Sequence, residues 1–281
     1  MGSQPRIVVP IARCLAKHGI PVALAAPAEA SSRAASRSRV WSRVEYLTRS
    51  SDQWADELLV SCERLGASWL VPCTDAALAA VAAERHRFHR LAAVACPRDA
   101  VVRRVLNRSE TMAVAAQVGL RVPMSFELPS RAVFVARAGL LPFPLVAKPA
   151  RKVASHHDFE SREYSTVSAL AAEFDSDAHF GEGLVFQDFV PGVGIGVHLL
   201  IHAGAVVAAF QRRRLRELPP QGGAVVAAVT EPVDPNLLSL STALLTALEW
   251  QGVGSSSRCE VSGLVRTRPT SRDVRGRPGD G

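Results

Sequence analysis

Apolar and polar positions over the first hundred residues follow the pattern of short buried strands that alternate with longer helical stretches. Strands are predicted at residues 22–25, 44–47, 69–71 and 92–95. Helices are predicted at residues 10–18, 52–65 and 75–83, with Asp52 and Asp75 at their N-caps. This alternation indicates a parallel sheet with crossover helices. Because so little chain precedes the first helix, the strand that normally opens such a sheet is expected to be shortened or missing.

The pattern changes after Pro97. One helix is predicted to end near Leu106, and Ser109 is expected to cap a second helix that ends at Gly119. The following chain is rich in strands, which are predicted at residues 124–127, 145–148, 184–189, 197–202 and 206–211. A turn at residues 202–205 joins the last two, and residues 236–250 form an amphipathic helix.

These patterns predict an α/β protein with two folded domains and a tail. Residues 1–97 form the parallel-sheet domain and residues 98–254 form an α+β core. From Ser255 the chain loses periodicity and hydrophobicity together, so residues 255–281 are predicted to be a disordered basic tail. A hydrophobic content of 48% is enough to bury a sizeable core.

Composition excludes several classes of protein. The net charge of +7 falls to +4 without the tail, which is ordinary for an enzyme, so no nucleic-acid partner is predicted. No apolar run of about 18 residues occurs, and the N-terminus lacks a signal-peptide pattern, so we expect a cytoplasmic protein without a membrane span. The five cysteines include no Cys-x-x-Cys pair, which suits neither a disulfide framework nor a zinc site.

A lysine ends one of the predicted strands. Lys148 follows the apolar run 144–147, in a chain that contains only three lysines among its 33 basic residues. An ammonium group at the mouth of a sheet can contact a phosphate. The alternative is an edge-strand lysine whose ammonium group reaches into solvent.

The strand at residues 184–189 leads into a polar pair and a Pro-Gly turn, which together suit an adenine-binding slot. Backbone groups of Asp188 and Val190 can contact the base, Gln187 supplies an amide, and the ring of Phe186 or Phe189 can pack on it. The alternative is an ordinary strand and turn. Three glycines at positions 192, 194 and 196 alternate after this segment, and they are expected to let two backbones approach closely.

The order and spacing of these segments resemble the ATP-grasp superfamily, as found in carbamoyl-phosphate-synthase-like domains and D-aspartate ligase. The matching segments are residues 106–108, 115–123, Lys148, 186–192 and 210–223. The resemblance implies that Arg108 and Lys148 contact ATP phosphates, and that Gln187, Asp188, Phe189 and Val190 hold adenine. It also implies a catalytic role for Arg214, as a clamp on a phosphate or an acyl phosphate.

The resemblance further implies a pre-ATP-grasp domain followed by an ATP-grasp core. Such enzymes join a small-molecule carboxylate to an amine through an acyl phosphate, and a homodimer is compatible with this type. Their Mg²⁺ ligands follow a segment matched here by Trp250-Gln251-Gly252-Val253, but only Glu260 stands there, among arginines. We therefore predict no metal ligand and a core that is C-terminally incomplete, as a truncated or frameshifted reading frame would produce. A catalytically inactive nucleotide-binding remnant and a regulatory binding module are the alternative functions.

Overall fold

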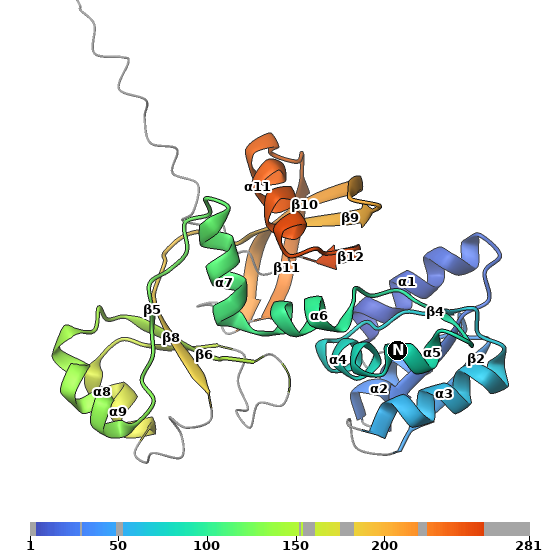
Figure 1. Ribbon diagram of the computed structural model, residues 1–281, viewed down its shortest axis with the longest axis horizontal. Coiled ribbons are helices and arrows are strands. Elements are labelled where there is room, and N and C mark those ends of the chain that lie inside the picture. Colours follow the sequence, from blue (N-terminus) through green and yellow to red (C-terminus); the bar gives the residue numbers. More distant parts are fainter. Residues whose placement is uncertain are drawn as a thin grey trace, which may run out of the picture.

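The computed structural model describes residues 4–28, 30–48, 53–151, 153, 161–174, 183–218 and 224–255. Its helices and strands form three groups (Figure 1). The N-terminal group lies at one end of the molecule, a four-stranded sheet with two short helices lies at the other, and a second four-stranded sheet lies between them.

The N-terminal group contains two pairs of parallel strands, β1 with β2 and β3 with β4. Its elements are α1 (Pro5–Lys17), β1 (Ala23–Pro27), α2 (Ala30–Ser36), β2 (Arg43–Leu47), α3 (Trp54–Leu65), β3 (Trp69–Leu70), α4 (Asp75–Ala83), α5 (Arg85–Phe88) and β4 (Ala93–Val94). All four predicted strands are confirmed and pair in parallel, but they form two separate two-stranded sheets and not the single sheet that was predicted. Buried apolar residues of α3, α4 and α5, such as Leu58, Val81 and Phe88, pack with Leu47 of β2 and Leu70 of β3.

The start of the chain differs from the prediction. Helix α1 begins at Pro5, five residues earlier than expected, so a helix occupies the described residues where a first strand would lie. Proline is well suited to the first turn of a helix, because the N–H it lacks would have no partner there. The cap of α4 is Thr74, whose hydroxyl accepts a hydrogen bond from the Ala77 N–H, and Asp75 is the first helical residue.

Helix α6 (Asp99–Leu106) connects the N-terminal group to the rest of the molecule. Its Val102 packs with Ala82 and Cys96, whereas the adjacent Val101 packs with Val197 of the central sheet. Helix α7 (Arg108–Gln117) follows directly. Its cap is Asn107, one residue before the helix, and not Ser109 as predicted, because the Asn107 side chain accepts from the Glu110 N–H at 3.2 Å.

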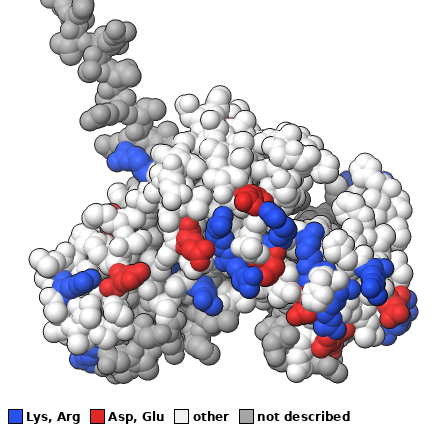
Figure 2. All heavy atoms as spheres, viewed as in Figure 1, with Lys and Arg blue, Asp and Glu red and all other residues white. Residues whose placement is uncertain are grey.

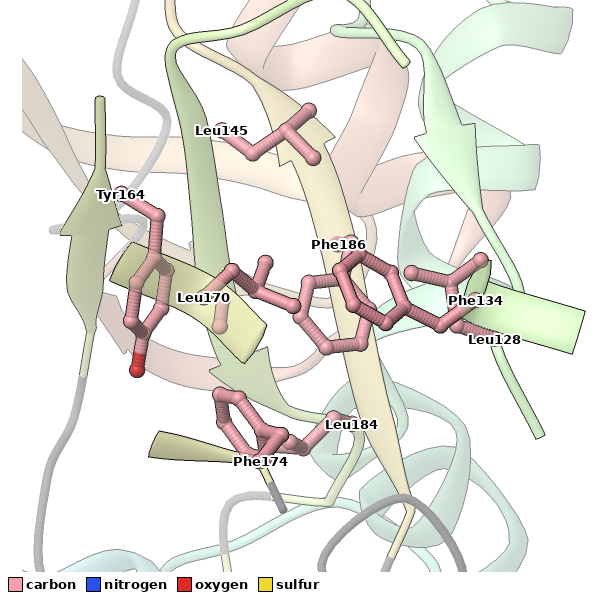
Figure 3. Packing of buried hydrophobic residues seen from close by; sticks show 9 residues of the cluster. Leu128, Phe134, Leu145, Tyr164, Leu170, Phe174, Leu184 and Phe186 are labelled. Atoms are coloured by element: carbon pink, nitrogen blue, oxygen red, sulfur yellow. The ribbon is translucent and has the colours of Figure 1, made fainter. Parts of the chain in front are cut away.

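The sheet at the far end has the strand order β5–β8–β6–β7, with every neighbouring pair antiparallel. Its elements are β5 (Ser125–Phe126), α8 (Arg131–Arg137), a 3₁₀ turn (Ala138–Leu140), β6 (Leu145–Pro149), β7 (Arg162–Tyr164), α9 (Val167–Glu173) and β8 (Leu184–Asp188). One face packs against α8 and α9 through an aromatic-rich core (Figure 3). In this core the Phe174 ring lies edge-on to both Tyr164 and Phe186.

The central sheet has the order β11–β10–β9–β12 and is antiparallel throughout. Its elements are β9 (Ile195–His202), β10 (Ala205–Leu218), β11 (Ala224–Glu231), α11 (Pro235–Ala247) and β12 (Gly252–Ser255). Helix α11 covers one face, on which Val197, Leu199 and Ile201 pack with Leu237 and Leu245.

The sequence pattern missed β7, β11 and β12, and it ended β10 seven residues too early. Ser255 belongs to β12, so the predicted tail does not begin there, and the remainder of that tail lies outside the described residues. In the part of the chain that is described, no helix combines the length and the apolar character needed to cross a bilayer.

The turn between β9 and β10 contains a strained residue. Ala203 has φ 49° and Gly204 has φ 78°, so both central residues have the positive φ of a type I′ turn. An alanine in this conformation costs about 1 kcal/mol relative to glycine or asparagine.

We expect Ala203→Gly and Ala203→Asn each to raise the free energy of unfolding by about 1 kcal/mol, because both residues accept positive φ more readily. Urea denaturation of the two variants measures this. Ala203→Val is the control at the same site and should lower the stability, since a β-branched residue is disfavoured at positive φ. Equal stability of all three variants would contradict the turn geometry.

Candidate functional site

The face of the far-end sheet that α8 and α9 leave uncovered carries a row of polar side chains. Ser125 of β5 is paired with Gln187 of β8, Gln187 with Val146 of β6, and Val146 with Glu163 of β7. Residues directly opposite each other in antiparallel strands point to the same face. Lys148 lies two residues beyond Val146, so its side chain projects from this face as well.

Lys148 and Arg108 are brought close together by the backbone of β6. The Arg108 N–H donates to the Ala150 carbonyl at 2.9 Å, and the Arg108 Nε donates to the Pro149 carbonyl at 2.6 Å. Strand β6 lies between β8 and β7, and Lys148 is only partly exposed. Strand β6 is thus not an edge strand of this sheet, although at Lys148 itself it is paired only with Val185 of β8.

The predicted adenine segment divides between the two faces of its sheet. Gln187 lies on the face away from α8 and α9 but is itself buried there, and its Nε2 donates to the Ser125 hydroxyl at 3.3 Å. Asp188 is paired with Leu145 and so points to the helix-covered face, as does the fully buried Phe186. The prediction that Phe186 could pack on a base is wrong, because its ring is part of the core in Figure 3.

Strand β8 is an interior strand, so the prediction of free edge-strand backbone groups needs correction. The Asp188 N–H donates to the Met124 carbonyl, and the Phe189 N–H donates to the Pro144 carbonyl. Val190 lies beyond the strand and is exposed. It is followed by Pro191 and by Gly192, whose φ of 153° bends the chain towards β9.

This connection brings the adenine segment near Arg214. The Arg214 N–H donates to the Gly194 carbonyl at 2.8 Å, and Gly194 is the fourth residue after Val190. A span of four residues reaches at most about 14 Å. The structure thus places Arg108 beside the end of the strand that carries Lys148, and it places Val190 within about 14 Å of Gly194, to which Arg214 bonds.

Gly194 and Gly196 lie in backbone contact with β10, as predicted, and they also make room for side chains. A Cβ at Gly194 would lie 2.5 Å from Arg214 Cδ, and a Cβ at Gly196 would lie 3.4 Å from His198 Nε2. Arg214 and Glu217 form an ion pair of 2.8 Å with little solvent exposure.

Two residues near these glycines were missed by sequence reasoning. His198 is half-buried beside the Phe210 ring, and burial, reinforced by the positive charge of Arg212, lowers its pKa to about 4. Burial also lowers the pKa of Arg212, with further contributions from Arg214 and Arg6. The signal that could have found them is the period of two in Gly194, Gly196, His198 and in Phe210, Arg212, Arg214.

The described residues do not fit a Mg²⁺ ion. Among them no group of three potential ligands gathers. Glu163 Oε2 and Asp188 Oδ1 are buried carboxylate oxygens without hydrogen-bond partners, but they lie on opposite faces of one sheet and cannot share an ion. Glu260 lies outside the described residues.

Basic side chains gather across the middle of one face of the molecule, with acidic side chains among them (Figure 2).

Two cavities lie away from the candidate site residues. One, of about 350 Å³, is lined in part by Arg98 and Trp250, and the other, of about 390 Å³, by Arg33 and Tyr46.

Comparison with solved structures finds the same arrangement of elements in several ATP-dependent enzymes. The biotin carboxylase domain of Hydrogenobacter thermophilus 2-oxoglutarate carboxylase, in complex with MgADP, ADP and bicarbonate, matches with a TM-score of 0.63 and 13% identity over 88% of this chain and 57% of that one. Campylobacter jejuni biotin carboxylase in complex with a β-γ-ATP ligand matches with a TM-score of 0.61 and 13% identity, over 87% of this chain and 58% of that one. An L-amino acid ligase from Bacillus licheniformis matches with a TM-score of 0.58 and 13% identity, over 88% of this chain and 59% of that one.

The chain has the ATP-grasp fold. It spans somewhat under three fifths of the length of these three structures. No family model matches the sequence, and no curated protein matches it. The parallel strands near the N-terminus and the two antiparallel sheets are the parts of the predicted ATP-grasp architecture that the structure contains.

The lowered pKa of His198 predicts acid-dependent stability in this protein. The unfolded chain takes up a proton on His198 near pH 6.5, whereas the folded chain does so only near pH 4. The stabilisation is therefore fully present well above pH 6.5 and is lost as the pH drops towards 4, by on the order of 1–2 kcal/mol once solvent screening of the half-buried ring is included. We expect His198→Gln to remove this part of the loss, as measured by urea denaturation between pH 7.5 and pH 4.

His202→Gln is the control, because His202 is an exposed residue at the end of the same strand. That variant should lose as much stability on acidification as the original chain. If His198→Gln also loses the same amount, His198 is not buried in its neutral form.

Proposed function

We propose that this protein binds ATP on the uncovered face of the β5–β8–β6–β7 sheet and along the connection to β9. Lys148 and Arg108 contact the phosphates. Gln187, Phe189 and the backbone of Val190 form the adenine end of the site. Arg214 acts at the reacting end, on the terminal phosphate or an acyl phosphate. The observation that carries the proposal is that Arg108 bonds to the residue next to Lys148, in a fold shared with structures that contain ADP and ATP ligands.

Charge and burial support the assignment of Lys148. A phosphate carries charge that must be compensated when the ligand leaves water, and a partly buried lysine on a strand can compensate it at a lower entropic cost than a fully exposed one. Arg108 contributes in a different way. Its Nε bond to the Pro149 carbonyl holds the end of β6 and the start of α7 together, so Arg108 stays beside the strand that carries Lys148.

The reaction type that we propose is formation of a C–N bond between a small carboxylate and an amine. A carboxylate oxygen attacks the γ-phosphorus, and ADP leaves with the bridging oxygen. The amine nitrogen then attacks the acyl carbon, phosphate departs, and the amine loses a proton to solvent. The guanidinium group of Arg214 is suited to hold the acyl phosphate, because its planar fork offers two parallel donors to an oxyanion.

ATP binding without catalysis is the second candidate function. It is favoured by the separation of the two unpartnered carboxylates, Glu163 and Asp188, on opposite sheet faces, which leaves magnesium without a converging ligand set in the described chain. Magnesium-dependent release of phosphate from ATP in the presence of a carboxylic acid and an amine distinguishes the two functions. A second copy of the chain is a further proposed partner, on the precedent of a structure described as a domain dimer.

We expect Lys148→Ala to weaken ATP binding by about 10- to 100-fold, because one hydrogen bond to a charged group contributes about 1.5–3 kcal/mol. Lys148→Arg should retain part of the affinity. Isothermal titration calorimetry with ATP, with and without magnesium, measures both effects.

Lys17→Ala is the matched control, because Lys17 is an exposed lysine in the last turn of α1. It should bind ATP as tightly as the original chain. The proposal is wrong if the original chain has no measurable affinity for ATP, or if Lys148→Ala binds ATP unchanged.

A further inference from the structure

A cavity of about 390 Å³ lies at the carboxyl ends of β1 and β2 in the N-terminal group. The residues that line it come from the end of β1, from β2, and from α2 with the residue that follows it: Ala28, Arg33, Ser36, Arg37 and Tyr46. In open α/β sheets, ligands bind beyond the carboxyl ends of the parallel strands. The volume also falls within the range of about 300–1,000 Å³ that small-molecule sites occupy.

The register of β1 and β2 places the Tyr46 ring at this cavity. Tyr46 pairs with Ala26, which is buried and packs with Ala35 of α2, so both side chains lie on the α2 side of the sheet. The Tyr46 hydroxyl donates to Ser36 Oγ at 2.8 Å, and the Ser36 hydroxyl donates to the Arg33 carbonyl at 3.0 Å. These two bonds fix the ring as a wall of the cavity, and 45% of the tyrosine remains exposed to a ligand.

Two arginines bring positive charge to the cavity. Arg33 and Arg37 are four residues apart, and Arg37 directly follows the last residue of α2, so both side chains lie on the same side of this helix. Like charges at this spacing repel each other and destabilise a helix slightly. Both arginines are exposed, and neither guanidinium group forms an ion pair or a hydrogen bond with another described residue.

The acidic residues of this part of the chain do not compensate these charges. Glu45, next to Tyr46 in β2, points to the opposite face of the sheet, where it pairs with Arg43 and with Arg64 of α3. The chain between Glu29 and Glu45 contains arginines but no acidic residue, and Glu29 itself lies outside the described residues. The described walls of the cavity therefore carry positive charge alone.

We propose that this cavity binds a phosphate monoester, with Arg33 and Arg37 on the phosphate oxygens and the rest of the ligand against the Tyr46 ring. Each guanidinium group offers two parallel donors to a phosphate. A phosphate monoester carries about −1.5 to −2 charge at pH 7, which matches two arginines better than a single carboxylate does. Two sources share this chemistry: a nucleoside monophosphate, whose base would stack on the Tyr46 ring, and a sugar phosphate without an aromatic ring. The site does not depend on ATP binding at Lys148, because its residues belong to the N-terminal group.

Isothermal titration calorimetry with ribose 5-phosphate, AMP and inorganic phosphate tests the site at constant pH and ionic strength. Each substitution is made both in the original chain and in Lys148→Ala, so that nucleotide binding at Lys148 can be separated. We expect Arg33→Gln and Arg37→Gln each to lower the affinity for ribose 5-phosphate about five- to tenfold, because each removes one charge-assisted contact at an exposed position. Arg39→Gln is the matched control, since Arg39 is an exposed arginine that does not line the cavity, and it should bind within about twofold of its parent.

Tyr46→Ala identifies which of the two sources the cavity accepts. For a nucleoside monophosphate, AMP binds at least about fivefold more tightly than ribose 5-phosphate, and Tyr46→Ala removes this difference, because the base loses its stacking surface. Tyr46→Phe keeps the ring and should preserve the preference for AMP. For a sugar phosphate, AMP and ribose 5-phosphate bind with equal affinity, and Tyr46→Ala does not change their ratio.

The melting temperature without ligand checks that the arginine variants remain folded. Arg33→Gln and Arg37→Gln should melt at the same temperature as the original chain or slightly higher, because each relieves the repulsion between the two arginines. The proposal is overturned if the original chain binds none of the three probes, or if both arginine variants bind them as tightly as Arg39→Gln does. A chain that binds ribose 5-phosphate but not ATP refutes only the proposed function, so the two proposals fail separately.

Discussion

The organisation of the candidate sites follows from one constraint: each four-stranded sheet buries only one of its faces against helices. Helices α8 and α9 cover one face of the far-end sheet, and α11 covers one face of the central sheet. Strand residues alternate between faces, so every second residue is free to be polar. Lys148, Glu163 and Gln187 occupy such positions on one sheet, and His198 and Arg212 occupy them on the other.

The connection from β8 to β9 joins these two polar faces. Within a few residues it leads from Gln187, through the exposed Val190 and the bend at Gly192, to Gly194 beside Arg214. A ligand that extends along this connection would contact both sheets. Because the two sheets have separate apolar cores, a change in the angle between them would alter the spacing of the groups on their polar faces without disrupting either core.

The arginines of β10 differ in how their charges are compensated. Arg213 and Arg214 are each neutralised by a nearby glutamate. Arg212 faces other arginines and a neutral histidine, an arrangement that folding alone does not favour.

Local patterns in the sequence determined where the elements lie. Apolar runs of four or five residues located β1, β2, β6 and β8 to within two residues at their ends, and the spacing of Lys148 and Arg214 along the chain indicated an ATP-grasp order. Strands β7 and β12 were missed because they contain charged or glycine residues and no apolar run, so they have little pattern of their own. Tertiary structure alone decided which face each side chain occupies. It placed Phe186 in the core and Gln187 outside it, and it brought His198 and Arg212 together around Gly196. The physical reason is that strand register and sheet order depend on contacts between residues far apart in the chain, which no local window of sequence contains.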